Sequence, residues 1–271
     1  MISQITDRTL LKLSGSEVQS FLQGQFSNDI NALDEGAVQM NAYCQHQGKI
    51  IALIWVMKRV DDYYLSFPGD LKAIVVQKLT MFKMMSDVQI KDVSDALIQL
   101  GLVDENFSDD KQGFSVFRLN DQQSVALVES VDELELADES AWKKACIENG
   151  VAEVTLDTSE VFVPQLLNLD IDEVGVNFTK GCYPGQEVVA RLHYLGKSKR
   201  RMRVFECDSD INIGDKLLVS GSNSAKASGI VVRCVKIDDK SLCLATIEIA
   251  HEDEKITLND AQGACLTRIH D

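Results

Sequence analysis

Eight consecutive residues, 180–187 (Lys-Gly-Cys-Tyr-Pro-Gly-Gln-Glu), bring a cation, a thiol, a phenol, an amide and a carboxylate into one short segment. Glycines close to Pro184 on both sides indicate a tight turn at the surface. An ammonium close to a thiol favours the thiolate, which is the reactive form. We therefore expect Lys180 to activate Cys182, and we predict these two residues as the catalytic pair.

The end of the same segment offers groups that suit a flat polar ligand. The amide of Gln186 and the carboxylate of Glu187 can grip a heterocycle such as a pterin along its hydrogen-bonding edge. The alternative is a Gly-Pro turn that carries only solvated charges. The residue types by themselves leave the ligand site and the ordinary turn equally open.

The composition limits the partners that the chain can have. Its 271 residues are 45% hydrophobic and 25% charged, which are ordinary values for a globular protein with a sizeable core. The 42 acidic and 27 basic residues give a net charge of −15, which repels phosphate backbones and anionic membrane surfaces. We therefore expect no direct nucleic-acid binding and no membrane association. No run of about 18 apolar residues and no secretory leader pattern are present.

The cysteines argue against a metal or disulfide framework. There are seven, an odd number, and no two form a Cys-x-x-Cys pair. A zinc site or an iron–sulfur cluster held by the chain's own thiolates needs closely grouped cysteines, and the four histidines share no ligand spacing. We predict no metal site and a reducing, cytoplasmic location.

Helix and strand patterns alternate in the first third of the chain. Ser14 and Glu17 have the spacing of a capping box for a first helix. Strands are expected on both sides of a turn at 45–48 and again at 63–67, and Asp70 is expected to cap a second helix. Such a mixture of paired strands and helices is typical of an α+β unit rather than a doubly wound sheet.

A second α+β unit and a region without helices follow. Strand patterns at 96–103, 114–119 and 124–128 precede a helix at 139–148, which Asn149-Gly150 would close. Beyond residue 200 the sequence predicts a small antiparallel barrel from short strands at 201–207, 216–220, 229–236, 241–249 and 265–269. With boundaries near 95 and 200, we expect an α+β domain over 1–95, a second over 96–200 and a barrel over 201–271.

The segment 178–187 resembles the signature of the folate-binding YgfZ family, which includes mitochondrial iron–sulfur assembly relatives and is related to the glycine-cleavage T-protein. Three further blocks are similar to those of the family. They are 13–30, with Phe-Leu-Gln-Gly-Gln and Asn-Asp-Ile, 43–49, with Tyr-Cys-Gln-His-Gln-Gly-Lys, and 163–169, with Val-Pro-Gln-Leu-Leu-Asn-Leu. The likeness covers nearly the whole chain, and its Lys-Gly-Cys-Tyr motif is specific.

This resemblance implies a T-protein-like ring of three domains, in which two α+β (ferredoxin-like) units and a C-terminal antiparallel β-barrel surround a folate-sized funnel. It implies tetrahydrofolate, or another reduced folate, as the cofactor. It also implies a role in the assembly or repair of iron–sulfur enzymes, with links to tRNA modification. The partners would be iron–sulfur assembly factors or client iron–sulfur enzymes. The family's cysteine and lysine fall on Cys182 and Lys180.

The residues expected to contact the folate come from the signature, from the two N-terminal blocks and from the basic stretch after the signature. They are Tyr183, Gly185, Gln186, Glu187, Asn28, Asp29, Tyr43, Arg191 and Arg200. For Asp29 the alternative is a polar residue that ends a helix, and for Tyr43 it is a core position.

One basic stretch interrupts the acidic balance of the chain. It consists of Arg191, Lys197, Lys199, Arg200, Arg201 and Arg203. One interpretation is an edge strand that charge protects from unwanted pairing. The other is a site for the glutamate tail of folate or for a phosphate-bearing partner.

The T-protein is an aminomethyltransferase, and its activity is the main alternative to an accessory role. Its turn matching 47–49 is followed, after two apolar residues, by an acidic pair that supports methylene transfer, whereas Ala52 and Leu53 stand here. General acid–base assistance needs a group within hydrogen-bond reach. We therefore favour a folate-binding accessory protein without conventional turnover over a one-carbon transferase, and whether the chain is an enzyme stays open. A folate-free interaction module is the third possibility.

Overall fold

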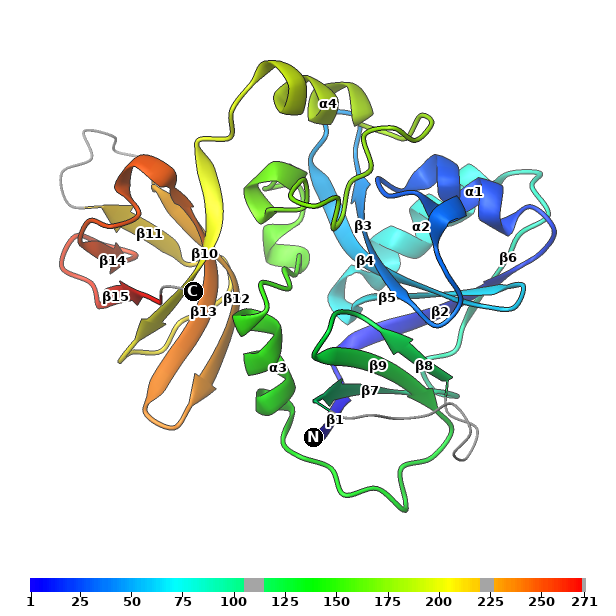
Figure 1. Ribbon diagram of the computed structural model, residues 1–271, viewed down its shortest axis with the longest axis horizontal. Coiled ribbons are helices and arrows are strands. Elements are labelled where there is room, and N and C mark those ends of the chain that lie inside the picture. Colours follow the sequence, from blue (N-terminus) through cyan, green and yellow to red (C-terminus); the bar gives the residue numbers. More distant parts are fainter. Residues whose placement is uncertain (105–114, 220–226, 270–271) are drawn as a thin grey trace.

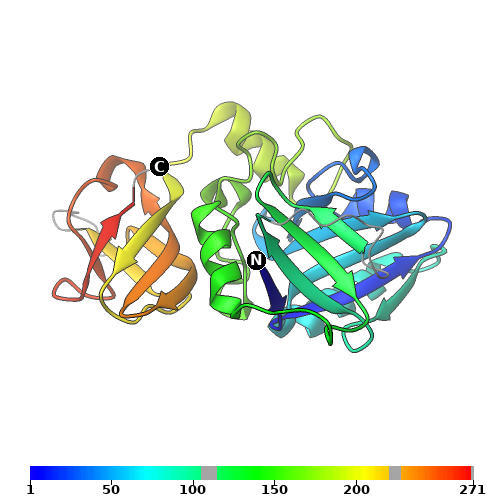
Figure 2. The same cartoon turned by 60° about the horizontal axis from the view of Figure 1, so that its bottom comes forward.

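Two open sheets and one closed barrel make up the computed structural model, which describes residues 1–104, 115–219 and 227–269 (Figure 1). The barrel lies on one side, the two sheets lie on the other, and α3 (Glu139–Glu148) stands between them (Figures 1 and 2). The predicted fold class, two α+β units followed by an antiparallel barrel, is confirmed.

The first sheet is antiparallel throughout and has the strand order β3-β4-β5-β2-β6. Its strands are β2 (Arg8–Ser14), β3 (Val38–Cys44), β4 (Ile50–Arg59), β5 (Asp62–Pro68) and β6 (Gln89–Asp92). The helices α1 (Val18–Gln25) and α2 (Lys72–Lys83) pack on one face, and the second sheet packs toward the other. Because both faces are covered, residues 50–57 of β4 are all buried, which accounts for their unbroken apolar run.

The second sheet has the order β1-β7-β9-β8 and contains the first strand of the chain. Its strands are β1 (Ile2–Ile5), β7 (Ile98–Val103), β8 (Ser115–Arg118) and β9 (Gln123–Val128). On the α3 side, Gly101 faces Trp142, where a Cβ would stand 2.2 Å from the indole, so only glycine leaves room for this ring. The boundaries near 95 and 200 stay predictions, and residues from both sides of the first one build this sheet.

Six strands close the carboxyl-terminal barrel in the order β10-β13-β12-β11-β14-β15. They are β10 (Arg200–Cys207), β11 (Lys216–Val219), β12 (Gly229–Ile237), β13 (Lys240–Glu248), β14 (Ile256–Leu258) and β15 (Cys265–Arg268). Five were predicted, and the three-residue β14 was not. Ser220 and Phe114, which two of the predicted strands include, lie outside the described residues. The remaining helices are α4 (Gln186–Leu195) and 3-10 turns at Ile30–Ala32, Gly69–Leu71, Leu156–Thr158, Pro164–Leu167 and Ile249–His251.

Two predicted helix caps are wrong, because tertiary contacts recruit the capping side chains. The Glu17 carboxylate accepts a hydrogen bond from the backbone N–H of Asp87 at 2.7 Å, and Ser14 is the last residue of β2. The Asp70 carboxylate accepts from the N–H of Leu156 at 2.8 Å instead of capping α2. By contrast, α3 ends as predicted at Asn149, and Gly150 follows with a φ of 66°.

A buried carboxylate joins the first sheet, the segment after α3 and the barrel. Glu153 lies 2.6 Å from Nη1 of Arg8 in β2 and 3.0 Å from Nη2 of Arg233 in β12. Arg8 also donates to the Ser66 carbonyl at 2.8 Å and lies 3.8 Å above the Trp55 ring. The side chains of the triad are all less than a tenth exposed. A charge removed from such a site leaves its partners buried and uncompensated.

We predict that Glu153→Gln lowers the free energy of unfolding by about 3–5 kcal/mol, because two buried guanidinium groups lose their shared counter-charge. Chemical denaturation measures this change. The matched control is Glu148→Gln on α3, where the exposed pair with Lys144 at 3.6 Å contributes at most ~1 kcal/mol. Equal effects of the two substitutions would contradict a role of Glu153 in joining the three parts.

Candidate functional site

Two glycine turns meet where the signature segment enters α4. Gly185 has a φ of 82° and precedes α4, and Gly48 has a φ of 76° in the turn between β3 and β4. A Cβ on Gly185 would stand 2.5 Å from the Gln45 carbonyl oxygen and 2.7 Å from the Cα of Gly48. The positive φ and the close backbone approach both require glycine. Two blocks of the resemblance, 43–49 and 178–187, are therefore in direct contact.

Lys180 is buried and bound by the end of α1 and the loop that follows it. Its ammonium donates to the carbonyl oxygens of Gln23, Phe26 and Asn28 at 2.8, 2.6 and 2.7 Å, and it lies 5.5 Å from the centre of the Tyr183 ring. Burial lowers the pKa of Lys180 to about 8, although the Asp29 carboxylate acts in the opposite direction. The ammonium thus fixes the loop, and its predicted effect on the Cys182 thiol stays a prediction.

Asn28 connects the loop that Lys180 binds to β3 and to the segment 173–174. Its side-chain N–H groups lie within hydrogen-bond distance of the carbonyl oxygens of Met40 at 3.2 Å and of Glu173 and Val174 at 3.3 Å. The neighbouring Asp29 accepts a hydrogen bond at its backbone oxygen from Gln39 at 2.8 Å. The predicted residues Asn28 and Asp29 therefore hold β3 and the 173–174 loop in place.

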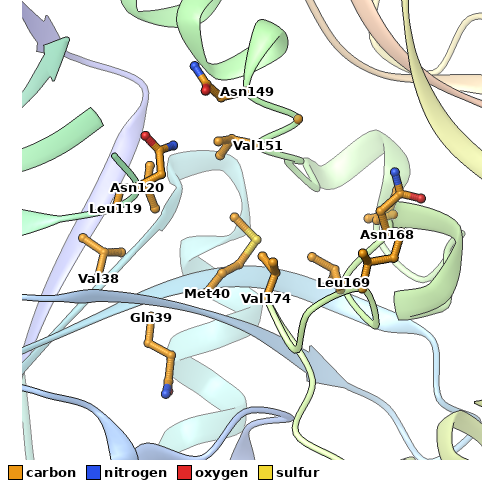
Figure 3. Close-up of a pocket in the computed structure, with 13 residues that line it drawn as sticks. Val38, Gln39, Met40, Leu119, Asn120, Asn149, Val151, Asn168, Leu169 and Val174 are labelled. Atoms are coloured by element: carbon orange, nitrogen blue, oxygen red, sulfur yellow. The ribbon is translucent and has the colours of Figure 1, made fainter. Parts of the chain in front are cut away.

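Both of these segments form walls of a cavity of about 480 Å³ (Figure 3). Its lining is mostly apolar and comes from β3, the end of β8, the end of α3 and the segment 167–174. Amide side chains of Asn120, Asn149 and Asn168 lie around it (Figure 3). The Asn149 amide donates to the Ala145 carbonyl at 2.9 Å, and its oxygen accepts no hydrogen bond from the described part of the chain. An apolar hollow with a few polar groups is typical of a small-molecule site.

None of the residues predicted to contact a folate lines this cavity. Cys182 and Glu187 are exposed, and Gln186 is half-buried in the first turn of α4. Tyr183 is buried, and burial raises its pKa. Tyr43 packs edge-on against Phe26 at 5.5 Å between ring centres. Because side chains alternate along β3, Tyr43 lies on the helix-covered face, opposite Met40.

The basic stretch divides into paired arginines and unpaired cations. Arg200 contacts Glu248 at 2.8 Å, Arg201 contacts Asp170 at 2.5 Å and Arg203 contacts Glu252 at 2.8 Å. These three arginines belong to β10, and Arg201 ties the barrel to the segment that lines the cavity. Arg191, Lys197 and Lys199 make no ion pair or side-chain hydrogen bond with the described residues.

The cavity residues were not predicted, because each is ordinary in its sequence context. Met40 and Val38 look like strand residues, and Asn149 looks like a helix end. Asn168 has a φ of 58° and exchanges hydrogen bonds with the backbone of Met202 at 3.1 and 3.3 Å. The one available signal was the block 163–169, which the resemblance had already singled out. Within the described ranges, no three His, Cys, Asp or Glu side chains gather as a metal site, and no helix has the length and apolarity to cross a bilayer.

Comparisons with known proteins identify relatives of the chain. No family model matches the chain. An uncharacterized protein of Haemophilus influenzae is 29% identical over 238 residues, which cover 86% of this chain and 84% of that protein. A protein of Colwellia psychrerythraea named tRNA-modifying protein YgfZ is 28% identical, over 96% of this chain and 89% of its own length. The chain is a homologue of the YgfZ proteins.

A solved structure confirms the expected fold of this YgfZ homologue. The glycine cleavage system aminomethyltransferase T from Bartonella henselae superimposes with a TM-score of 0.72, over 100% of this chain and 84% of that one. The two sequences are 12% identical, so the likeness concerns the fold alone. The family resemblance and the T-protein-like architecture predicted from the motifs are both confirmed.

We predict that Gly185→Ala destabilises the protein by about 1–3 kcal/mol, because alanine meets the 45–48 turn and a strained φ. Thermal and chemical denaturation measure this change. Gly181→Ala, four residues earlier in the same segment, is the matched control, since its Cβ meets nothing within 4 Å. A neutral Gly185→Ala would show that the two turns can move apart.

The pKa of Lys180 predicts a stability change at alkaline pH. Between pH about 8 and the ordinary lysine pKa of 10.5, the unfolded chain keeps the proton that the native site releases. Because the unfolded state then binds more protons, this contribution to stability is lost below pH about 8 and rises with pH across the interval. Denaturation at a series of pH values should show the rise for the wild type relative to Lys180→Met. Parallel pH profiles for the two proteins would rule out a buried ammonium that titrates in this range.

Proposed function

We propose that this protein binds tetrahydrofolate, or another reduced folate, in the cavity that is lined by β3, the end of β8, the end of α3 and the segment 167–174. In this proposal it is an accessory protein that supports assembly or repair of iron–sulfur enzymes and tRNA modification, in a soluble compartment such as the cytoplasm. Its partners are iron–sulfur assembly factors or their client enzymes. Cys182 is the reactive group, and no conventional turnover is required.

The observation that carries the proposal is the cavity itself. About 480 Å³ bounded by Val38, Met40, Val151 and Leu169 suits a flat heterocycle, and apolar walls favour a ring that is removed from water. At its edge the side-chain oxygen of Asn149, which accepts no hydrogen bond from the described residues, can accept one from the polar edge of a pterin. A T-protein-like fold and relatives named for tRNA modification support the same assignment.

The signature segment would then act beside the ligand. Lys180 and Asn28 position the cavity walls through the bonds described above, and Gly185 lets the turn at 45–48 close against α4. Contacts from Tyr183, Gln186, Glu187, Arg191 and Arg200 to a bound folate remain part of the proposal. The exposure of Cys182 leaves its thiol accessible to a partner protein.

The runner-up is a one-carbon transferase of the T-protein type. Residues 50–57 of β4 are buried and contain no carboxylate, so the strand that follows the 45–48 turn offers no acid or base. General acid–base catalysis needs such a group close to the reacting atoms. Aminomethyl transfer is therefore the weaker of the two functions.

We expect tetrahydrofolate to bind wild type and Cys182→Ala with equal affinity in isothermal titration calorimetry. Val38→Trp, which fills the cavity, should weaken binding at least ~10-fold, or about 1.4 kcal/mol. Val161→Trp is the matched control, because Val161 is more than a third exposed and lies outside the cavity lining. No binding to wild type would refute the folate assignment, and unchanged binding to Val38→Trp would refute its place.

The thiol is tested separately in cells that lack the protein. Wild type should restore the activity of iron–sulfur enzymes, and Cys182→Ala should not, although it still binds folate. The matched control is Cys265→Ala, which removes the other exposed cysteine. Full rescue by Cys182→Ala would remove the thiol from the mechanism, and methylene transfer by purified wild type would favour the runner-up.

A further inference from the structure

The structure separates the cations of the basic stretch into two groups with different surroundings. The three arginines of β10 are neutralised by carboxylates at 2.5–2.8 Å. Arg191, Lys197 and Lys199 are exposed, and the described residues offer them no carboxylate. Residues 176–199 hold four basic residues and a single acidic one, Glu187, in a chain whose net charge is −15. Apart from the buried Lys180, three unpaired cations therefore lie close together in the sequence, in α4 and the link 196–199.

An exposed aromatic cluster lies on the same segment. The rings of Phe178 and His193 stack with centres 3.7 Å apart and planes 18° apart. Tyr194 packs edge-on against both, at 6.1 Å from Phe178 and 4.9 Å from His193. Tyr194 nevertheless stays 65% exposed, and the next residue, Leu195, is 84% exposed. The three rings thus pack against one another, and the cluster still exposes ring surface to solvent.

The position of α4 makes this cluster accessible. In Figure 1 the helix and the link that follows it form the upper edge of the molecule, above both the first sheet and the barrel. Only Val189 of α4 is buried. We use the term α4 surface for Phe178, Arg191, His193, Tyr194, Lys197 and Lys199.

We propose that the α4 surface is a docking site for single-stranded RNA. Unpaired lysine and arginine side chains neutralise phosphates, and exposed aromatic rings stack with unpaired bases. The two features occur together here and within a few residues of each other. An acidic protein partner would use the cations, but it would have no need of a stacked aromatic platform. No residue of the α4 surface lines the cavity, and the proposal does not depend on folate binding. Arg191 alone is shared with the proposed folate contacts, and the test below leaves it unchanged.

The acidic remainder of the molecule limits how this surface can work. A net charge of −15 repels RNA elsewhere, so contact is restricted to the α4 surface and the affinity is modest. Three neutralised phosphates predict that the logarithm of the binding constant falls with the logarithm of salt concentration with a slope of about −2. Bases in a duplex are already stacked, so an unstructured strand should bind better than a duplex.

The test is fluorescence anisotropy with a labelled, unstructured RNA oligonucleotide at several low salt concentrations. We expect binding by wild type, a loss of at least ~10-fold for Lys197→Glu/Lys199→Glu and a loss of at least ~5-fold for Tyr194→Ser. Lys91→Glu on β6 is the matched control, because Lys91 is exposed and has no side-chain partner among the described residues. It should keep wild-type affinity, and circular dichroism checks that every variant is folded.

Two results would overturn the proposal. One is no binding by wild type at the lowest salt concentration. The other is a loss on charge reversal without any loss for Tyr194→Ser, together with equal displacement by poly-glutamate, which would identify a general anion patch for acidic proteins. Tetrahydrofolate titration of the same variants keeps this outcome distinct from the folate proposal, since all of them should bind folate as wild type does.

Discussion

The carboxylate of Glu153, held between Arg8 and Arg233, is the contact on which the arrangement of the three parts depends. It is buried, so its charge is tolerable only with both guanidinium groups in place. Arg233 also lies 3.2 Å from the carbonyl oxygen of Val151, which lines the cavity. The interaction that joins the first sheet to the barrel therefore also holds one of the residues that line the cavity.

A second set of contacts holds the opposite side of the cavity. The Lys180 ammonium binds the carbonyl of Asn28, and the Asn28 amide binds those of Met40 and Val174, both of which belong to cavity-lining residues. The residue types of the signature thus have structural reasons. A lysine is long enough to reach a buried loop, and Gly185 alone permits the close approach of the 45–48 turn. Cys182, by contrast, is exposed and supports none of these contacts.

Elements that depend on neighbouring residues were predictable from the sequence, and contacts between residues far apart in the sequence were not. Strand patterns, the end of α3 and the barrel followed from periodicity and turn residues. The Ser14–Glu17 capping box failed because Glu17 bonds to Asp87, 70 residues away. Helix α4 was missed, since Pro184-Gly185 indicates a turn and the helix begins at the very next residue. The cavity was invisible because Met40, Asn149 and Asn168 meet only through the packing of separate elements.

The effect of a charged residue also depends on contacts that form only in the folded structure. A net charge of −15 is an average, and a ligand meets only the local distribution. Ion pairs with Glu248 and Asp170 offset the charges of Arg200 and Arg201, whereas Lys197 and Lys199, a few residues away in the sequence, have no such partner among the described residues. A run of basic residues therefore acquires meaning only when its counter-charges are known. In this chain the counter-charges divide the basic stretch into two groups. The arginines of β10 are paired with carboxylates, and Arg201 attaches the barrel to its neighbouring segment. Arg191, Lys197 and Lys199 are exposed and can bind a ligand.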